Sequence, residues 1–117
     1  LSYKGDSLKM YEKIVETVKS EVLAMEEIIL VSPTGTAIQN ARTSFVGDTL
    51  TRDGYHLSYA LGRYIAGLTF VRALTGLPID EIGFIPQGIN DDAAAVAIES
   101  VNNAIQKPYQ VTPSIFT

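Results

Sequence analysis

Residues 51–58 lead directly into an apolar stretch that ends near Gly76, and they read Thr51-Arg52-Asp53-Gly54-Tyr55-His56-Leu57-Ser58. The polar part holds the only histidine of the 117-residue chain, three residues after an aspartate. The apolar part predicts a helix that Ser58 caps and Gly76 stops. Because this helix is apolar on two faces, we expect it to be mostly buried and to form the centre of the core.

The run Ile28-Ile29-Leu30-Val31, upstream of this stretch, predicts the fold class. A continuous apolar run rich in β-branched residues is typical of a short strand buried on both faces of a parallel sheet. Pro33 lacks the N–H that a sheet ladder requires, so the predicted strand ends there. The sequence therefore predicts an α/β fold, mostly helical in this chain, with one short parallel-type strand at residues 28–31.

A long amphipathic helix is predicted before this strand. Asp6 or Ser7 caps it, and it runs to about Glu27. Its apolar residues recur at three- and four-residue steps and form one stripe, which consists of Leu8, Tyr11, Val15, Val18, Val22 and Met25. We expect this stripe to pack on a flat surface.

Two further helices complete the prediction. One runs from Thr34 to about Arg42, and the other is capped by Asn90 or Asp91 and runs to about Gln106. The apolar loop at residues 77–90 is expected to lie against a surface. The chain after the last helix is expected to be extended.

Composition limits the class of protein. The length of 117 residues fits one domain at most, so residues 1–117 form a single domain or part of one. A net charge of −4 and a pI near 4.8 argue against nucleic-acid binding, which needs a basic face. No apolar run approaches the roughly 20 residues of a membrane span. The absence of cysteine excludes disulfides and thiolate metal sites.

The first residues, Leu1-Ser2-Tyr3-Lys4, have neither a starting methionine nor the apolar core of a signal peptide. We interpret the chain as a mature or trimmed piece, the C-terminal part of something longer. Its cellular compartment is left open by the sequence.

The Asp53-x-x-His56 spacing is the strongest chemical signal. A serine hydroxyl is a poor nucleophile until a base takes its proton, and a histidine base works best when a carboxylate fixes its tautomer. An Asp-x-x-His turn brings both groups together by local geometry. By spacing alone, a capped turn with a structural histidine is the competing interpretation.

The residues around this turn resemble the last conserved block of SGNH (GDSL-type) hydrolases, and more narrowly a bacterial SGNH-like family. The likeness rests on residues 53–58, on Leu61-Gly62-Arg63-Tyr64, and on the preceding stretch from Pro33 to Arg42. It covers most of residues 8–110. It implies a three-layer α/β/α fold and the hydrolysis of esters, often acetyl esters on carbohydrates. By this resemblance His56 is the general base and Asp53 is its orienting carboxylate.

The resemblance also requires a nucleophilic serine in a Gly-Asp-Ser block, and a glycine and an asparagine for the oxyanion hole. Gly5-Asp6-Ser7-Leu8 spells the first block, but no convincing strand precedes it, so we expect Ser7 to cap a helix. Gly88-Ile89-Asn90-Asp91 spells the asparagine block, but it follows the histidine, and capping is again expected. We therefore expect the nucleophile and the oxyanion donors upstream, and this piece alone to be inactive.

Other chemistry has weaker signals. A metal site built from His56, Asp53 and Asp48 would have only one nitrogen ligand, which is fewer than zinc sites usually have. Neither a metal nor a cofactor is therefore expected. Three arginines are expected to flank the cleft, and one of them could contact an acidic or sugar substrate; these are Arg42, Arg52 and Arg63. The rings of Tyr55, Tyr59 and Tyr64 could line a carbohydrate groove by stacking. Surface or core positions are the competing interpretation for all of them.

Together, these observations predict the C-terminal portion of a serine esterase or acetylesterase that acts on a small-molecule or carbohydrate ester. An exposed strand edge and apolar surface predict self-association, or pairing with the missing N-terminal portion. The alternative is a non-catalytic helical binding or assembly module in which His56 is structural.

Overall fold

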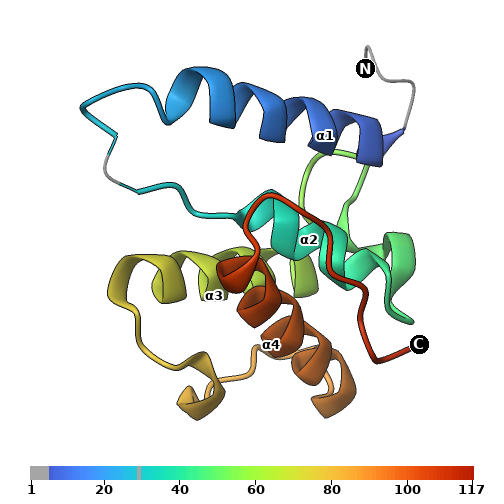
Figure 1. Cartoon of the computed structure of the whole chain (residues 1–117). Helices are drawn as coiled ribbons and strands as arrows, with labels where there is room; N and C mark the ends of the chain where they lie inside the picture. The colour runs from blue at the N-terminus through green and yellow to red at the C-terminus, as the bar shows by residue number, and fades with distance from the viewer. Residues whose placement is uncertain (1–5, 29) are drawn as a thin grey trace.

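The computed structural model describes residues 6–28 and 30–117, and these residues form a helical domain (Figure 1). The α-helices are α1 (Ser7–Thr17), α2 (Thr34–Arg42), α3 (Leu61–Thr75) and α4 (Asp91–Gln106). The shorter helical segments are the π-helical η1 (Val18–Val22) and the 3₁₀ turns η2 (Gly47–Leu50) and η3 (Ile79–Glu81). Residues 107–117 follow α4 without regular structure. None of the described helices is long and apolar enough to cross a membrane.

The core lies where α2, α3 and α4 pack against one another, with η2 and η3 closing its edges. α2 and α4 contribute many small side chains, so their backbones approach closely. The fully buried apolar residues are Ala37, Ala41, Leu50, Ile65, Ile79, Val96, Ala97, Val101 and Ala104. The loop at residues 77–90 lies against the core at the buried Ile79 and the half-buried Ile82, whereas Phe84 and Ile85 are exposed.

Helix α3 confirms the predicted central helix, with two adjustments. It begins at Leu61 rather than at Ser58, although the Ser58 Oγ still accepts the amide of Gly62 at 2.8 Å. Gly76 ends it in the left-handed conformation (φ 71°), as predicted. One apolar face is buried, but the other remains exposed at Phe70. The helix is therefore central but not buried all round.

The predicted three-layer α/β/α fold with a parallel strand at residues 28–31 is wrong. Among the described residues there is no strand, and the only β-type pairing is an isolated antiparallel bridge between Thr51 and Leu57. Ile28 and Leu30 are exposed, whereas Ile29 lies outside the described residues. An apolar run cannot be assigned as a strand unless another strand takes up its backbone hydrogen bonds. Residues 28, 30 and 31 instead belong to the connection between η1 and α2.

The predicted helix at residues 7–27 is shorter in the structure. Its α-helical part ends at Thr17, and in η1 the amide of Leu23 bonds to the carbonyl of Val18, so the last turn is widened. Asp6 is the N-cap, with its carboxylate accepting the amide of Lys9 at 3.0 Å. The prediction that Ser7 is the cap is therefore wrong, because Ser7 is the first residue of the helix.

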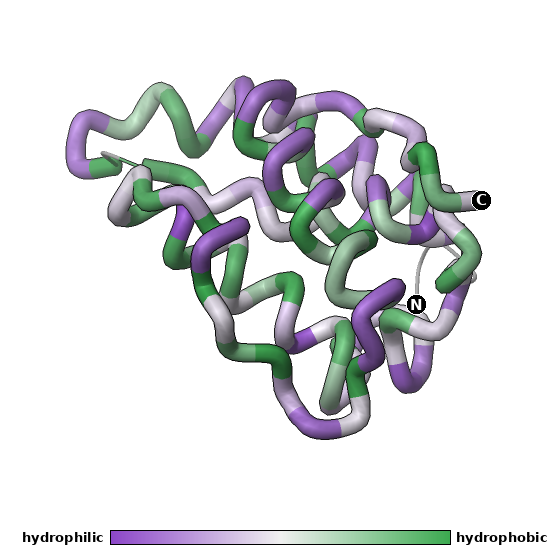
Figure 2. Tube along the Cα trace, turned by 90° about the horizontal axis from the view of Figure 1, so that it is seen from below, coloured by the Kyte–Doolittle hydropathy of each residue, from purple (hydrophilic) through white to green (hydrophobic). Residues whose placement is uncertain are grey.

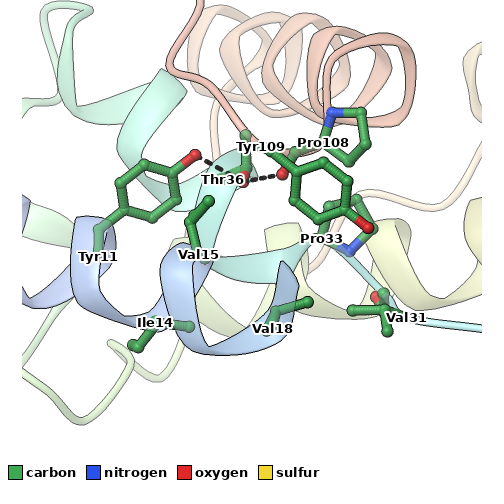
Figure 3. A pocket seen from close by; sticks show the side chains of 11 residues that line it. Tyr11, Ile14, Val15, Val18, Val31, Pro33, Thr36, Pro108 and Tyr109 are labelled. Carbon is green, nitrogen blue, oxygen red and sulfur yellow. Dashed lines mark hydrogen bonds between the residues drawn. The ribbon is translucent and has the colours of Figure 1, made fainter. Parts of the chain in front are cut away.

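Helix α1 rests on α2 along a narrow seam, away from α3 and α4 (Figure 1). Tyr11 is its only buried residue, and the Tyr11 hydroxyl lies 2.9 Å from the Thr36 Oγ1, which donates to the carbonyl of Pro108 (Figure 3). The apolar stripe is exposed at its two ends, Leu8 and Met25, as are the hydrophobic stretches between η1 and α2 that lie at one end of the tube in Figure 2. The exposed apolar residues of this region are Leu8, Ile14, Leu23, Met25, Ile28 and Leu30.

Helix α4 begins as predicted. The Asn90 side chain accepts the amide of Ala93 at 2.8 Å, so Asn90 is the N-cap. The chain after α4 turns back across α2 and is held there by side chains of the helices. The buried Asn40 donates to the carbonyl of Ser100 at 3.1 Å and accepts the amide of Thr112 at 2.7 Å. Glu99 accepts the amide of Ile115 at 2.8 Å.

Candidate functional site

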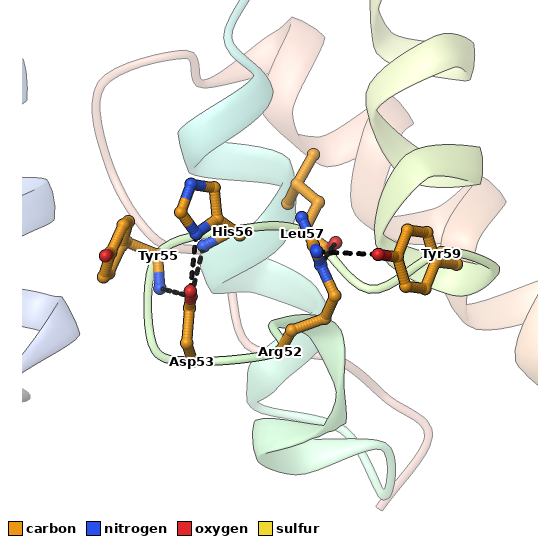
Figure 4. A network of polar contacts seen from close by, with 6 residues as sticks. All are labelled: Arg52, Asp53, Tyr55, His56, Leu57 and Tyr59. Carbon is orange, nitrogen blue, oxygen red and sulfur yellow. Dashed lines mark hydrogen bonds and ion pairs between the residues drawn. The ribbon is translucent and has the colours of Figure 1, made fainter.

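The Asp-x-x-His turn connects η2 to α3 and is closed by backbone hydrogen bonds (Figure 4). The amide of Arg52 donates to the carbonyl of His56 at 2.7 Å, and the amide of Ser58 donates to the carbonyl of Leu50 at 2.8 Å. Gly54 has φ +98°, a conformation that side-chain-bearing residues rarely adopt. The Asp-Gly pair therefore fixes the course of the chain between Asp53 and His56.

Asp53 and His56 are in direct contact. Asp53 Oδ2 lies 2.5 Å from His56 Nδ1, and Asp53 Oδ1 accepts the amides of Tyr55 at 3.1 Å and His56 at 2.8 Å. The hydrogen bond from the His56 side chain, followed by that from the His56 backbone, lowers the pKa of Asp53 from 3.8 to about 2. An ionised carboxylate only accepts hydrogen bonds, so the proton is assigned to Nδ1, and Nε2 of the neutral ring has the free lone pair.

This pair is open to solvent. The side chain of His56 is 53% exposed and that of Asp53 is 42% exposed. The ring of Tyr55 leans on the imidazole, with the two ring centroids 4.3 Å apart. The site is therefore a half-exposed histidine whose Nδ1 is bound by Asp53. Its Nε2 edge is left for a further group to approach.

A second cluster adjoins the turn on the α3 side. The guanidinium carbon of Arg52 lies 4.5 Å from the centroid of the Tyr59 ring, and that of Arg63 lies 4.6 Å from it. Arg52 also donates from Nη1 to the Tyr59 hydroxyl at 2.9 Å and from Nε to the carbonyl of Leu57 at 3.0 Å. We call Arg52, Tyr59 and Arg63 the arginine cluster. The sequence indicated these residues singly but not their meeting on one ring.

A groove of about 150 Å³ runs along the other side of the turn, between the turn, α1 and α2. Ser7 lines it together with Gly54 and Tyr55, whereas Asp53 and His56 are not among its lining residues. No hydrogen bond joins His56 to a hydroxyl group within residues 6–28 and 30–117. The structure thus brings Asp53 and His56 together but does not complete a triad with Ser7.

The other residues singled out by the sequence lie elsewhere. Asp48 forms an ion pair with Arg42, and no group of three or more metal-ligating side chains gathers in the described part of the chain. Asn90 is engaged as the cap of α4. Tyr64 is buried, with its hydroxyl 3.3 Å from the carbonyl of Phe84, and burial raises the pKa of that hydroxyl.

The fold and the site together define a helical domain that carries an Asp-x-x-His turn on its surface. The profile of the family described as "Domain of unknown function (DUF4886)" matches residues 1–104, and the chain belongs to this family. The chain is similar to a DUF4886 family protein from Bacteroides uniformis ATCC 8492, whose crystal structure was solved at 1.50 Å resolution. The two share 45% sequence identity with a TM-score of 0.83. The match covers 90% of this chain and 40% of that one, so this chain spans less than half of its relative. None of the curated proteins matches it.

Proposed function

We propose that this domain supplies the histidine base and its orienting aspartate to a serine esterase site of the SGNH type. The observation that carries the proposal is the 2.5 Å hydrogen bond between Asp53 Oδ2 and His56 Nδ1, which leaves Nε2 with its lone pair. The likeness of residues 53–64 to the last block of SGNH hydrolases supports the same roles. A turn that only positioned the start of α3 would not require the side chains of Asp53 and His56 to contact each other on an exposed surface.

In the proposed reaction, His56 Nε2 removes the proton of a serine hydroxyl while the serine oxygen bonds to the ester carbonyl carbon. The tetrahedral intermediate collapses, the C–O bond to the alcohol breaks, and His56 returns the proton to the leaving oxygen. Water then hydrolyses the acyl-enzyme with His56 again acting as base. Asp53 stabilises the imidazolium formed in each step. The expected substrate is a small-molecule or carbohydrate ester, with acetyl as the acyl group.

The nucleophile and the oxyanion donors are expected from a longer polypeptide. The chain spans 40% of its solved relative, so such proteins contain residues that this sequence does not include. The exposed apolar residues of α1 and of the segment before α2 are a suitable surface for pairing with that remainder, or for self-association. The 117-residue chain by itself is expected to be inactive.

The test is ester hydrolysis by the full-length protein, measured with p-nitrophenyl acetate. His56→Ala should lower kcat/KM roughly 10²- to 10⁴-fold, because it removes the base. Asp53→Asn should lower it as well, because the neutral amide no longer stabilises the imidazolium. Asp92→Asn, which changes an exposed acid at the start of α4, is the matched control and should leave activity unchanged. Unchanged activity in His56→Ala would contradict the site assignment.

A second experiment tests Ser7, which shares a groove with the turn. The 117-residue chain is assayed with and without Ser7→Ala. Activity of the chain that disappears in this variant would show that the triad is complete within this sequence. The proposal expects no activity in either protein.

A non-catalytic binding or assembly module is the second candidate, and the same exposed apolar residues favour it. In that case Asp53 and His56 only order the turn before α3. The full-length protein would then show no ester hydrolysis, and His56→Ala would leave any association unchanged.

A further inference from the structure

We propose that the arginine cluster is a binding subsite for an oxyanion, so that the ester hydrolysed at His56 carries a carboxylate or phosphate group. The statement that the anion belongs to an ester substrate rests on the proposed function. The anion-binding part rests on the geometry of Arg52, Tyr59 and Arg63 alone.

The position of Arg52 links the cluster to the Asp53–His56 pair. Its backbone amide bonds to the carbonyl of His56 at 2.7 Å, and its Nε bonds to the carbonyl of the next residue, Leu57, at 3.0 Å. Its Nη1 reaches the Tyr59 hydroxyl at 2.9 Å. Figure 4 shows the guanidinium extending from the turn towards Tyr59, on the side opposite to Tyr55. Arg52 and the proposed base therefore belong to the same hydrogen-bonded turn.

The two guanidinium groups of the cluster form no ion pair within the described part of the chain. Arg42 has an ion-pair partner in Asp48, but among the ion pairs of residues 6–28 and 30–117 neither Arg52 nor Arg63 takes part. Both guanidinium groups lie over the ring of Tyr59, so two positive charges are held at one aromatic side chain in a chain of net charge −4. An oxyanion bound beside this ring is attracted by both positive charges, and the planar guanidinium fork matches the oxygens of carboxylate and phosphate.

The cluster also borders a concave surface. Tyr59 and Arg63 form part of the wall of a groove of about 380 Å³ between α3 and residues 82–86. Its other walls are largely apolar and include Leu68 and Phe84. The groove gives the acid-bearing part of a substrate an apolar surface to lie on, so binding need not depend on the charges alone.

The experiment compares acetyl esters that differ in one substituent, which is a carboxylate, its uncharged methyl ester or a phosphate. The full-length protein is assayed with 4-acetoxybenzoate, with its uncharged methyl ester, and with 4-acetoxyphenyl phosphate. The wild type should prefer the charged esters in kcat/KM. Arg63→Gln should reduce this preference about three- to tenfold through KM, the range of a partly exposed charged hydrogen bond. Arg63→Lys should restore part of it.

Arg63 is the cleaner position, because Arg52 also supports the turn through Leu57. Arg72→Gln, a change of the same kind on the same helix, is the control and should leave the preference as in wild type. Loss of preference for only one charged ester assigns the subsite to carboxylate or to phosphate. No preference in the wild type, or equal loss in Arg63→Gln and Arg72→Gln, would overturn the proposal.

A binding measurement separates this proposal from the esterase proposal. Calorimetry with 4-hydroxybenzoate and with inorganic phosphate is carried out on full-length His56→Ala, with and without Arg63→Gln. Binding that weakens in the double variant supports the subsite even if the wild type has no esterase activity. The absence of binding, or binding that Arg63→Gln leaves unchanged, overturns the subsite even if the esterase activity is present.

Discussion

The carboxylate of Asp53 accepts three hydrogen bonds, and all three donors belong to the turn itself. They are the ring of His56 and the backbone amides of Tyr55 and His56. None of these contacts depends on a distant part of the chain. The Asp53–His56 pair could therefore be predicted from sequence, because three-residue spacing and Gly54 determine it locally. The arginine cluster could not be predicted in this way, because Arg52 reaches Tyr59 only after its side chain has folded back across the turn.

The ionisation of Asp53 gives a prediction about pH. The pKa of this carboxyl in the folded protein is about 2, below its ordinary value of 3.8. Its contribution to the turn is therefore complete above pH 3.8 and is lost as the pH falls through about 2. The amide resonances of Tyr55 and His56, which bond to Asp53 Oδ1, should shift with a midpoint near pH 2 in NMR titrations.

Asp53→Asn is the control for this titration, since the neutral amide has no proton to gain in this range. The low-pH shift of the two amides should be absent in the variant. A midpoint near 3.8 in the wild-type protein would show that His56 does not hold the carboxylate in solution.

At the scale of the elements, the start of α3 depends on a glycine. A Cβ on Gly62 would lie 2.5 Å from the backbone oxygen of Leu50, so the turn and the helix could not keep their present distance. Gly62→Ala should therefore destabilise the chain by about 2 kcal/mol through overpacking, measured by urea unfolding.

Gly67 is the matched control on the same helix. A Cβ there meets nothing within 4 Å, and alanine favours helix more than glycine does, so Gly67→Ala should stabilise by up to about 1 kcal/mol. If both substitutions changed the free energy of unfolding in the same direction, the result would contradict the close approach of α3 to the Leu50 backbone.

The buried side-chain amide of Asn40 joins α2 to α4 and to the chain that follows α4. Asn40→Ala leaves the amide of Thr112 without its acceptor and should cost about 2 kcal/mol of unfolding free energy. Asn103→Ala, on α4, removes an amide with no such side-chain bonds and should change stability by less than about 0.5 kcal/mol. Similar losses in both variants would contradict the role given to Asn40.

The prediction of elements from sequence succeeded where local chemistry decides the outcome. Asn90 and Gly76 were found from capping rules, because a cap is built from residues within one turn. The run at residues 28–31 was misassigned, since apolar residues favour burial without specifying which partner provides it. The length of α1 was overestimated for a related reason: its apolar stripe continues beyond Thr17, but α2 covers only the part around Tyr11.

For the molecule as a whole, the uncovered apolar surface predicts association. The 117-residue chain should show a mass above 12.7 kDa in light scattering at micromolar concentration. Ile14→Asp should shift it towards the monomer, because Ile14 is an exposed apolar residue of α1, 51% exposed. Ile115→Asp, at an isolated position that is 81% exposed, should have no effect. A mass of 12.7 kDa at every concentration would exclude self-association.

The chain that follows α4 places the boundary of the structural unit beyond the boundary of the family match. The family profile ends at residue 104, yet the side-chain oxygens of Asn40 and Glu99, both within the match, accept hydrogen bonds from donors at residues 112–115. A recombinant protein cut at residue 104 would thus lose the partners of groups that it retains. Family members expressed for study should therefore extend past the matched region by at least the length of this returning segment.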